Sequence, residues 1–296
     1  MTYQSPRPRG YRTTAAFRAG LEARLTTESA DRGLDVNRLR RQVAFERLLV
    51  RLAADQTADT WVLKGGLALE LRLAGQCRAT RDLDLAIVGS VDGDVVQRRL
   101  LDAVAEDVHG DRFNFLVAVP RPLAADLSGR PGWCFPVDVT LAGRTFVKVR
   151  LYVVARAEEI EGAVEQITFP SSLAFAGFPP SVTVSAIDLA QHAAEKLHAL
   201  TREYGDRPNT RVKDLVDLVL LLEHNLLDST DVATRVRTVF AARATHDIPP
   251  EIPAPPAAWR ADYAALVAGL DVEASTVDAA MTIVHPLWKA CSSYHD

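Results

Sequence analysis

The chain has 296 residues, a formal net charge of −4, 48% hydrophobic and 24% charged residues. These proportions are typical of a globular protein with enough material for one large domain or two lobes. No apolar run approaches the roughly 20 residues that cross a bilayer. No apolar segment follows the basic residues of the N-terminus either, so we expect neither a membrane span nor a secretory signal. The three cysteines, Cys77, Cys134 and Cys291, lack CxxC spacing, which indicates a reduced, cytoplasmic protein without a structural zinc site.

Positive charge gathers at the N-terminus although the whole chain is acidic. Residues 1–51 contain eleven arginines and five acids, a local charge of +6. Such asymmetry is compatible with an anionic partner on one side of the molecule. Solvated helix faces explain most of these arginines equally well.

Hydrophobic periodicity predicts an α/β (α+β) fold with a small mixed sheet between N-terminal helices and a C-terminal helical lobe. After an extended arm over the first dozen residues, helices are expected at 13–32 and 37–54. Strands are expected at 61–63, 82–88, 113–119, 135–141 and 145–154, with helices at 67–73 and 91–108. A segment at 170–182 with Pro and Ser is interpreted as a linker, and later helices are expected at 187–204, 211–222, 231–243 and 275–290. The predicted domains are therefore residues 1–180 and 181–296.

The stretch 61–88 carries the strongest chemical pattern. Its first strand ends at Lys64-Gly65-Gly66, and its second strand begins with Asp82 and Asp84. Alternate strand residues share a face, so the two carboxylates are expected to lie about 6–7 Å apart at Cα. Mg²⁺ suits one or two carboxylates completed by substrate phosphates, and a diglycine lets backbone N–H groups approach a phosphate. Each pattern alone is commonly a turn or a solvated strand edge, but together they favour a metal and phosphate site.

KGG followed by TRDLDL resembles the signature of polymerase-beta-type nucleotidyltransferases, in the variant carried by AbiEii toxins and their MenT relatives. A second block, AEKLHALTREYGDRPNTRVKDLVDLVLL, is similar to the later motifs of that group and follows about 105 residues further on. The resemblance covers most of the chain. It implies a sheet of nucleotidyltransferase type with the active site between the sheet and the C-terminal helices.

The resemblance also implies residue roles. The expected catalytic residues are Asp82, Asp84, Lys196 and Asp214, with Mg²⁺ or Mn²⁺ on Asp82 and Asp84. A nucleoside triphosphate is expected to contact Lys64, Gly65, Gly66, Thr80 and Lys196. Asp217 is expected to support its helix, and local pairing of Arg211 with Asp214 and of Lys213 with Asp217 is the alternative explanation for these acids. His192 and His198 do not make a convincing metal pair.

One departure from the superfamily concerns a third carboxylate that is usually found on a later strand. Tyr152 stands where that acid is expected, and Asp138, on the preceding predicted strand, is the acid nearby. Either Asp138 substitutes for it, or the site works with the two strand acids and Asp214. We favour the second interpretation.

Thr80 matches a position that is Ser in some relatives, where phosphorylation silences the enzyme. A phosphate at Thr80 would place about −1.5 to −2 charges beside the metal site. The alternative is a hydroxyl that only hydrogen-bonds its own loop.

The resulting hypothesis is a Mg²⁺-dependent nucleotidyltransferase that acts as the toxin of a toxin–antitoxin or phage-defence pair. By resemblance, its acceptor is RNA, the 3′ end of tRNA, where added nucleotides block aminoacylation and translation. A cognate antitoxin protein is the expected partner. Two alternatives remain open at this point: transfer to a small molecule or a protein, and a catalytically silent member that binds RNA or a partner.

Overall fold

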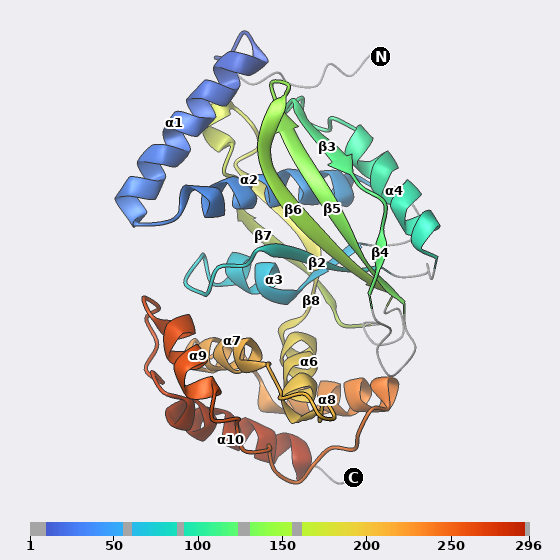
Figure 1. Cartoon of the computed structure of the whole chain (residues 1–296), viewed down its shortest axis with the longest axis vertical. Helices are drawn as coiled ribbons and strands as arrows, with labels where there is room; N and C mark the ends of the chain where they lie inside the picture. Colours follow the sequence, from blue (N-terminus) through green and yellow to red (C-terminus); the bar gives the residue numbers. More distant parts are fainter. Residues whose placement is uncertain (1–9, 56–60, 88–91, 124–130, 156–161, 294–296) are drawn as a thin grey trace.

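The computed structural model describes residues 10–55, 61–87, 92–123, 131–155 and 162–293. A twisted sheet with N-terminal helices forms one half of the molecule, and helices from the last third of the chain form the other half (Figure 1). Among these residues, no helix is long and apolar enough to cross a membrane. Part of the predicted N-terminal arm (1–9), the predicted strand end at Val88 and the predicted helix start at Val91 lie outside the described residues.

Two long helices, α1 (Thr14–Arg32) and α2 (Val36–Ala54), open the fold. Their first turns are capped by the side chains of Thr13 and Asp35, each of which accepts a backbone N–H. Such caps satisfy N–H groups that have no partner inside the helix. Gly33 ends α1 in the left-handed region at φ 62°, which glycine adopts at low cost.

Eight strands within the described ranges form one mixed sheet. Their order is β3-β5-β6-β2-β1-β8-β7, and the short β4 pairs with β5 outside this path. β2 is antiparallel to β1 and parallel to β6. The strands are β1 (Trp61–Lys64), β2 (Asp82–Ile87), β3 (Phe113–Val117), β4 (Arg121–Pro122), β5 (Gly132–Leu141), β6 (Arg144–Ala155), β7 (Val164–Pro170) and β8 (Ser181–Ile187). The helix α3 (Gly65–Arg72) connects β1 to β2, and α4 (Gly93–Ala105) follows β2.

Alternation along the strands gives the sheet one apolar and one polar face. Leu83, Leu85, Phe135 and Leu151 belong to the main core together with residues of α1, α2 and α4. Asp82 and Asp84 alternate with these leucines, so they lie on the opposite face. The predicted mixed sheet with N-terminal helices is confirmed, and the helices leave the carboxylate face free for chemistry.

The C-terminal helices form the predicted helical lobe. Its own core also contains Leu73 and Cys77, from the connection between α3 and β2, which ties the lobe to the sheet. The helices are α6 (Leu189–Thr201), α7 (Val212–Glu223), α8 (Ser229–Arg243), α9 (Trp259–Val267) and α10 (Val277–Ser292). Of these, α9 was not predicted.

The interpretation of residues 170–182 as a linker is wrong. They are mainly the turn of a hairpin in which β7 and β8 pair antiparallel, with a short 3-10 helix, η1 (Ala174–Ala176), inside the turn. β8 also pairs in parallel with β1, so it belongs to the sheet. The chain enters the helical lobe at Asp188, the N-cap of α6. The division at residue 180 stays a prediction, and the sheet continues past it.

Several of the described N-terminal arginines form ion pairs inside the protein. Arg51 donates to both carboxylate oxygens of the buried Asp111 at 2.7 Å, and Arg47 lies 3.1 Å from the same carboxylate. Arg38 pairs with the buried Glu70 at 2.7 Å. These guanidinium groups are therefore engaged inside the protein, which weakens the interpretation of this segment as a surface for an anionic partner.

Candidate nucleotidyl-transfer site

The strand register brings a lysine and two carboxylates together. Lys64, the last residue of β1, is the register partner of Asp84 on β2. Asp82 is two residues earlier on β2 and shares the face of Asp84. The paired carboxylates and the cation that the sequence predicted at this edge are thus neighbours in the fold.

Gly65 allows β1 to turn directly into α3 beside Asp84. Its φ is +65°, and a Cβ at this position would lie 2.7 Å from Asp84 Cγ. A side chain is therefore excluded both by the backbone conformation and by the carboxylate. Gly66 follows, where a Cβ would lie 3.1 Å from Thr80 Oγ1. The diglycine thus keeps the start of α3, with its unpaired N–H groups, against the carboxylates.

Asp84 is the carboxylate with the most unusual environment. Burial raises the pKa of Asp84 to about 6; Lys64 opposes this rise and the charge of Asp82 adds to it. Asp82, by contrast, accepts a hydrogen bond at 2.9 Å from Nε of Arg150, a half-exposed arginine. Among the described residues, the Asp84 carboxylate has no hydrogen-bonded cation of its own. It is therefore a group that an incoming cation would stabilise.

The helical lobe reaches Lys64 through Glu195 on α6. Lys64 Nζ donates to Glu195 Oε2 at 2.6 Å, and Arg243 of α8 lies 3.4 Å from the same oxygen. Gln191 donates to the other oxygen at 3.2 Å. Burial alone would raise the pKa of Glu195, but Lys64 and Arg243 outweigh it and hold this pKa well below its ordinary value. The ion pair joins the last residue of β1 to the helical lobe.

Lys196 lies in a second buried network, on α6 and α7. Its Nζ is 3.1 Å from Asp214 Oδ1 and 2.6 Å from Asp217 Oδ2. Arg78 donates to both oxygens of Asp217, at 2.8 and 2.6 Å. Burial lowers the pKa of Lys196, but the two aspartates outweigh it and the pKa is raised overall. Lys196 therefore stays charged, and Asp217 has the supporting role expected of it.

The alternative local pairing on α7 is only half realised. Arg211 Nε lies 2.8 Å from Asp214 Oδ2, as helical spacing predicts. Asp217 instead pairs with Lys196 and Arg78, which come from other segments. Asp214 thus holds Lys196 and Arg211 side by side.

These groups line one cleft of about 370 Å³ between the sheet and the helical lobe. It is lined by all eight residues predicted for catalysis or nucleotide binding, together with several residues for which no catalytic or nucleotide-binding role was predicted. The predicted ones are Lys64, Gly65, Gly66, Thr80, Asp82, Asp84, Lys196 and Asp214, and the additional ones include Arg78, His192, Glu195, Arg211, Lys213 and Arg243. Several of these additional residues come from distant segments and carry no motif spacing of their own, so no local pattern indicated that they line the site.

His192 is the least expected of these residues. It is 2% exposed, and neither ring nitrogen has a hydrogen-bond partner among the described residues. Burial lowers the pKa of His192 well below its ordinary value, and the nearby Lys196 adds to this effect, so the ring is neutral. In the sequence His192 belongs to a predicted helix with an apolar face, and nothing there indicated that its side chain lines the cleft.

The structure separates Asp138 from the carboxylate pair. Asp138 lies opposite Lys148 on β6, at 3.6 Å, and lines a different groove. Tyr152, by contrast, is the register partner of Asp84. The position beside Asp84 therefore carries a phenol, and Asp138 does not stand in for the missing acid there.

Thr80 lies beneath the diglycine and is 8% exposed. Its Oγ1 donates to the backbone carbonyl of Asp82 at 3.1 Å. This contact fits the interpretation of a loop-bracing hydroxyl, and phosphorylation of Thr80 stays a prediction.

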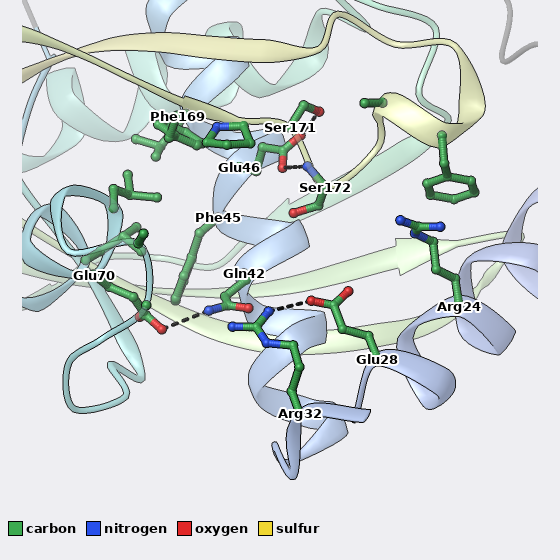
Figure 2. Close-up of a pocket in the computed structure, with 18 residues that line it drawn as sticks. Arg24, Glu28, Arg32, Gln42, Phe45, Glu46, Glu70, Phe169, Ser171 and Ser172 are labelled. Carbon is green, nitrogen blue, oxygen red and sulfur yellow. Dashed lines mark hydrogen bonds and ion pairs between the residues drawn. The ribbon is translucent and has the colours of Figure 1, made fainter. Parts of the chain in front are cut away.

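A second cavity of about 370 Å³ lies between α1, α2, α3 and the β7–β8 turn (Figure 2). Its buried acids already have partners: Glu46 accepts from Ser171 Oγ and Ser172 N at 2.6 Å, and Glu70 accepts from Gln42 at 2.8 Å. These contacts fasten the turn to α2 and α3. Because its carboxylates serve the packing, this cavity is a weaker candidate for chemistry than the cleft at Asp82 and Asp84.

In the part of the chain that the structure describes, no three His, Cys, Asp or Glu side chains form a cluster able to hold a metal ion by themselves. The cleft offers two carboxylates instead. A cation there would need further ligands from a substrate or from water. Mg²⁺ is commonly bound in this way, by one or two carboxylates together with substrate phosphates and water.

Comparison with known proteins agrees with this geometry. The model of the family described as nucleotidyl transferase AbiEii toxin, type IV TA system, matches residues 47–283. The fold is similar to MenT4, a nucleotidyltransferase toxin from Mycobacterium tuberculosis H37Rv, with a TM-score of 0.58, 17% identity and coverage of 93% of this chain and 90% of that chain.

A weaker similarity is to an antigenic nucleotidyltransferase-like protein from Paracoccidioides brasiliensis, with a TM-score of 0.39, 14% identity and coverage of 69% of this chain and 92% of that chain. A search of curated proteins finds no match to this chain. The family match spans both blocks that line the cleft, so this chain belongs to the AbiEii family of nucleotidyltransferase toxins of type IV toxin–antitoxin systems.

Proposed function

We propose that this chain transfers a nucleoside monophosphate from a nucleoside triphosphate to the 3′ end of tRNA, in a Mg²⁺-dependent reaction that blocks translation. The observation that carries the proposal is the cleft itself. It faces the carboxylates of Asp82 and Asp84 with Lys64, Lys196 and further cations of the helical lobe. A triphosphate with its metal ion has the complementary pattern of charge.

The carboxylate pair fits a hard divalent cation. Asp84 is a carboxylate whose pKa is raised by burial and which has no cation bonded to it among the described residues. Together with Asp82 it would hold Mg²⁺, with Mn²⁺ as an alternative. When bound, such an ion neutralises charge on the phosphates and holds the reacting oxygens in line.

The residues of this chain supply the binding of the triphosphate. Gly65 and Gly66 open α3, whose free N–H groups attract anions. Lys64 lies at the same end of the sheet. Lys196, kept protonated by Asp214 and Asp217, presents a fixed positive charge from the opposite wall. Holding the triphosphate from two sides orients its α-phosphate for the attacking hydroxyl, and such positioning supplies much of the rate in phosphoryl chemistry.

The test is label transfer with the purified full chain. Mg²⁺, total tRNA and each α-³²P-labelled nucleoside triphosphate in turn are incubated with wild type and with Asp82→Ala. We expect label in the tRNA band with at least one nucleotide and none with the variant. Omission of Mg²⁺ tests whether transfer needs the ion. A parallel reaction with γ-³²P-labelled triphosphate should leave the tRNA unlabelled, because the γ-phosphate leaves with pyrophosphate when the nucleotidyl group moves.

The two alternatives give different results in the same assay. Label in a small molecule or in protein, with none in RNA, would move the acceptor class away from RNA. Nucleotide binding without any transfer by folded wild type would support a silent site. Growth inhibition that is unchanged in Asp82→Ala would contradict a catalytic toxin, because it would not depend on the carboxylate pair.

A further inference from the structure

The helical lobe covers only part of the polar face of the sheet. In the β3–β5–β6 portion the side chains on this face are open: Leu116 is 62% exposed, and the side chains of Lys148 and Arg150 are 76% and 54% exposed. The alternating residues of the same strands are buried against the N-terminal helices. This open area belongs to the same face of the sheet as Asp82 and Asp84.

The open area is hollowed into a groove of about 460 Å³, here called the sheet groove. Its charged residues are four cations and one acid. The acid, Asp138, lies 3.6 Å from Lys148 and is the only anion among the residues that line the groove in the described part of the chain. The cations are Arg41, Arg81, Lys148 and Arg150, and the apolar floor includes Leu116, Ala118 and Pro136.

The sheet groove lies next to the nucleotidyl-transfer cleft, and the pair of Arg150 and Asp82 connects them. Arg150 lines the groove and donates to Asp82 at 2.9 Å, and Asp82 lines the cleft. Arg81 is the residue before Asp82 in the chain. Across β2, β6, β5 and β3 the groove spans three inter-strand spacings, about 14 Å in all. A molecule lying along it would place one end beside the carboxylates.

We propose that the sheet groove binds the single-stranded 3′ segment of the RNA acceptor and delivers its terminal hydroxyl to Asp82 and Asp84. The inference rests on the proposed function, because that function makes an RNA end the acceptor. Exposed cations beside an apolar floor match a strand with a charged backbone on one side and bases on the other. The net positive charge of the groove is the more telling because the chain as a whole is acidic.

The groove also accounts for RNA binding by an acidic protein with little contribution from its N-terminal arginines. Arg38, Arg47 and Arg51 are engaged by buried carboxylates, and of the described N-terminal arginines Arg41 alone lines the groove. Lys148 and Arg81 are exposed and are not part of the buried networks. The phosphate contacts are therefore expected from the sheet surface.

The experiment compares the double variant Arg81→Ala/Lys148→Ala with wild type. A matched control, Arg260→Ala/Lys289→Ala, removes the same charge from exposed positions of α9 and α10 in the helical lobe. Both doubles change exposed side chains, so both are expected to keep the fold, which thermal melting checks. Binding is measured by fluorescence anisotropy with a labelled RNA hairpin that carries a four-nucleotide single-stranded 3′ end, and with the same hairpin made blunt.

We expect wild type to bind the overhanging hairpin more tightly than the blunt one. The groove double should raise the Kd for the overhanging hairpin about tenfold or more, and its slope of log K against log salt should fall by about 1.4, which is about 0.7 for each lost phosphate contact. The control double should keep the wild-type Kd and slope. Binding of a fluorescent nucleoside triphosphate with Mg²⁺ should be the same in all three proteins.

Any of four results would overturn the inference. The groove double could bind RNA as wild type does, the control double could lose as much affinity, or wild type could fail to distinguish the two hairpins. If wild type binds no RNA but the groove double escapes neutralisation by the antitoxin, the groove is a protein-docking surface and the inference is equally wrong. The proposed transferase activity is judged separately, since groove-dependent RNA binding without label transfer would sink that function and leave the groove assignment standing.

Discussion

Replacing Asp84 with Asn should stabilise the metal-free protein. Burial raises the pKa of Asp84 to about 6 from an ordinary 3.8. Ionisation of Asp84 therefore requires more free energy in the folded protein than in the unfolded chain. At pH 8 the two pKa values correspond to about 3 kcal/mol of unfolding free energy, an upper limit because part of the carboxyl group is open to solvent.

The pH dependence gives the sign of the effect. A raised carboxyl pKa destabilises the fold fully above the folded value of about 6 and ceases to do so below 3.8. The advantage of Asp84→Asn should thus shrink from at most about 3 kcal/mol at pH 8 to about half that at pH 5. Asn keeps the shape of the side chain, so the comparison isolates the charge.

Urea unfolding with EDTA, at pH 8 and at pH 5, measures both values. Mg²⁺ with a nucleoside triphosphate should then raise the stability of wild type and leave that of Asp84→Asn nearly unchanged. A variant that is less stable than wild type at pH 8, or an advantage that grows toward pH 5, would refute the reasoning that Asp84 is a buried carboxylate kept for a cation.

Three further changes test the surroundings of this group. Gly65→Ala should abolish label transfer and lower the melting temperature, because the added Cβ would collide with Asp84. The control is Gly143→Ala, where φ is +69° and no atom lies within 4 Å of the added Cβ. It introduces backbone strain without a collision, so it should keep activity. Asp217→Asn should lower the free energy of unfolding, measured with urea at pH 7, by about 3 kcal/mol, since it breaks a buried ion network. Burial raises the pKa of Asp217, but Lys196 and Arg78 outweigh it and lower this pKa to about 2. The difference in unfolding free energy between wild type and variant should therefore be complete above pH 4 and narrow as the pH falls toward 2. Lys64→Ala removes the cation that lowers the pKa of Asp84, so the acid limb of the pH–activity profile should move to higher pH; an unmoved limb would show that Lys64 does not act on that carboxylate.

The sequence by itself determined the local chemistry of the site. Alternation in Asp82-Leu83-Asp84-Leu85 places both carboxylates on one face because strand residues repeat every two positions. The diglycine after β1 marks the turn that only glycine fits at Gly65. Helical spacing on α7 likewise indicated the pair of Arg211 and Asp214, as part of the alternative explanation for the acids of this helix. Each of these inferences needs only neighbours in the chain.

The β7–β8 hairpin shows where local patterns misled. Its second strand, Ser181–Ile187, alternates as a strand should, but the Pro and Ser residues at 170–182, between the two strands, resemble a linker. Only the pairing of β8 with β1 makes the segment part of the sheet. Pairing between distant strands is a tertiary property that no local propensity contains.

Tertiary structure alone decided which charges act on the site. Lys64 meets Glu195 across 131 residues, and Arg78 meets Asp217 across 139. Several N-terminal arginines, such as Arg38 and Arg51, form internal ion pairs, while the basic groove takes most of its cations from Arg81, just before β2, and from Lys148 and Arg150 on β6. The physical reason is that the strength of a charge–charge interaction depends on how close the two groups lie in space and how deeply they are buried. Neither the distance nor the burial can be read from the order of residues in the sequence.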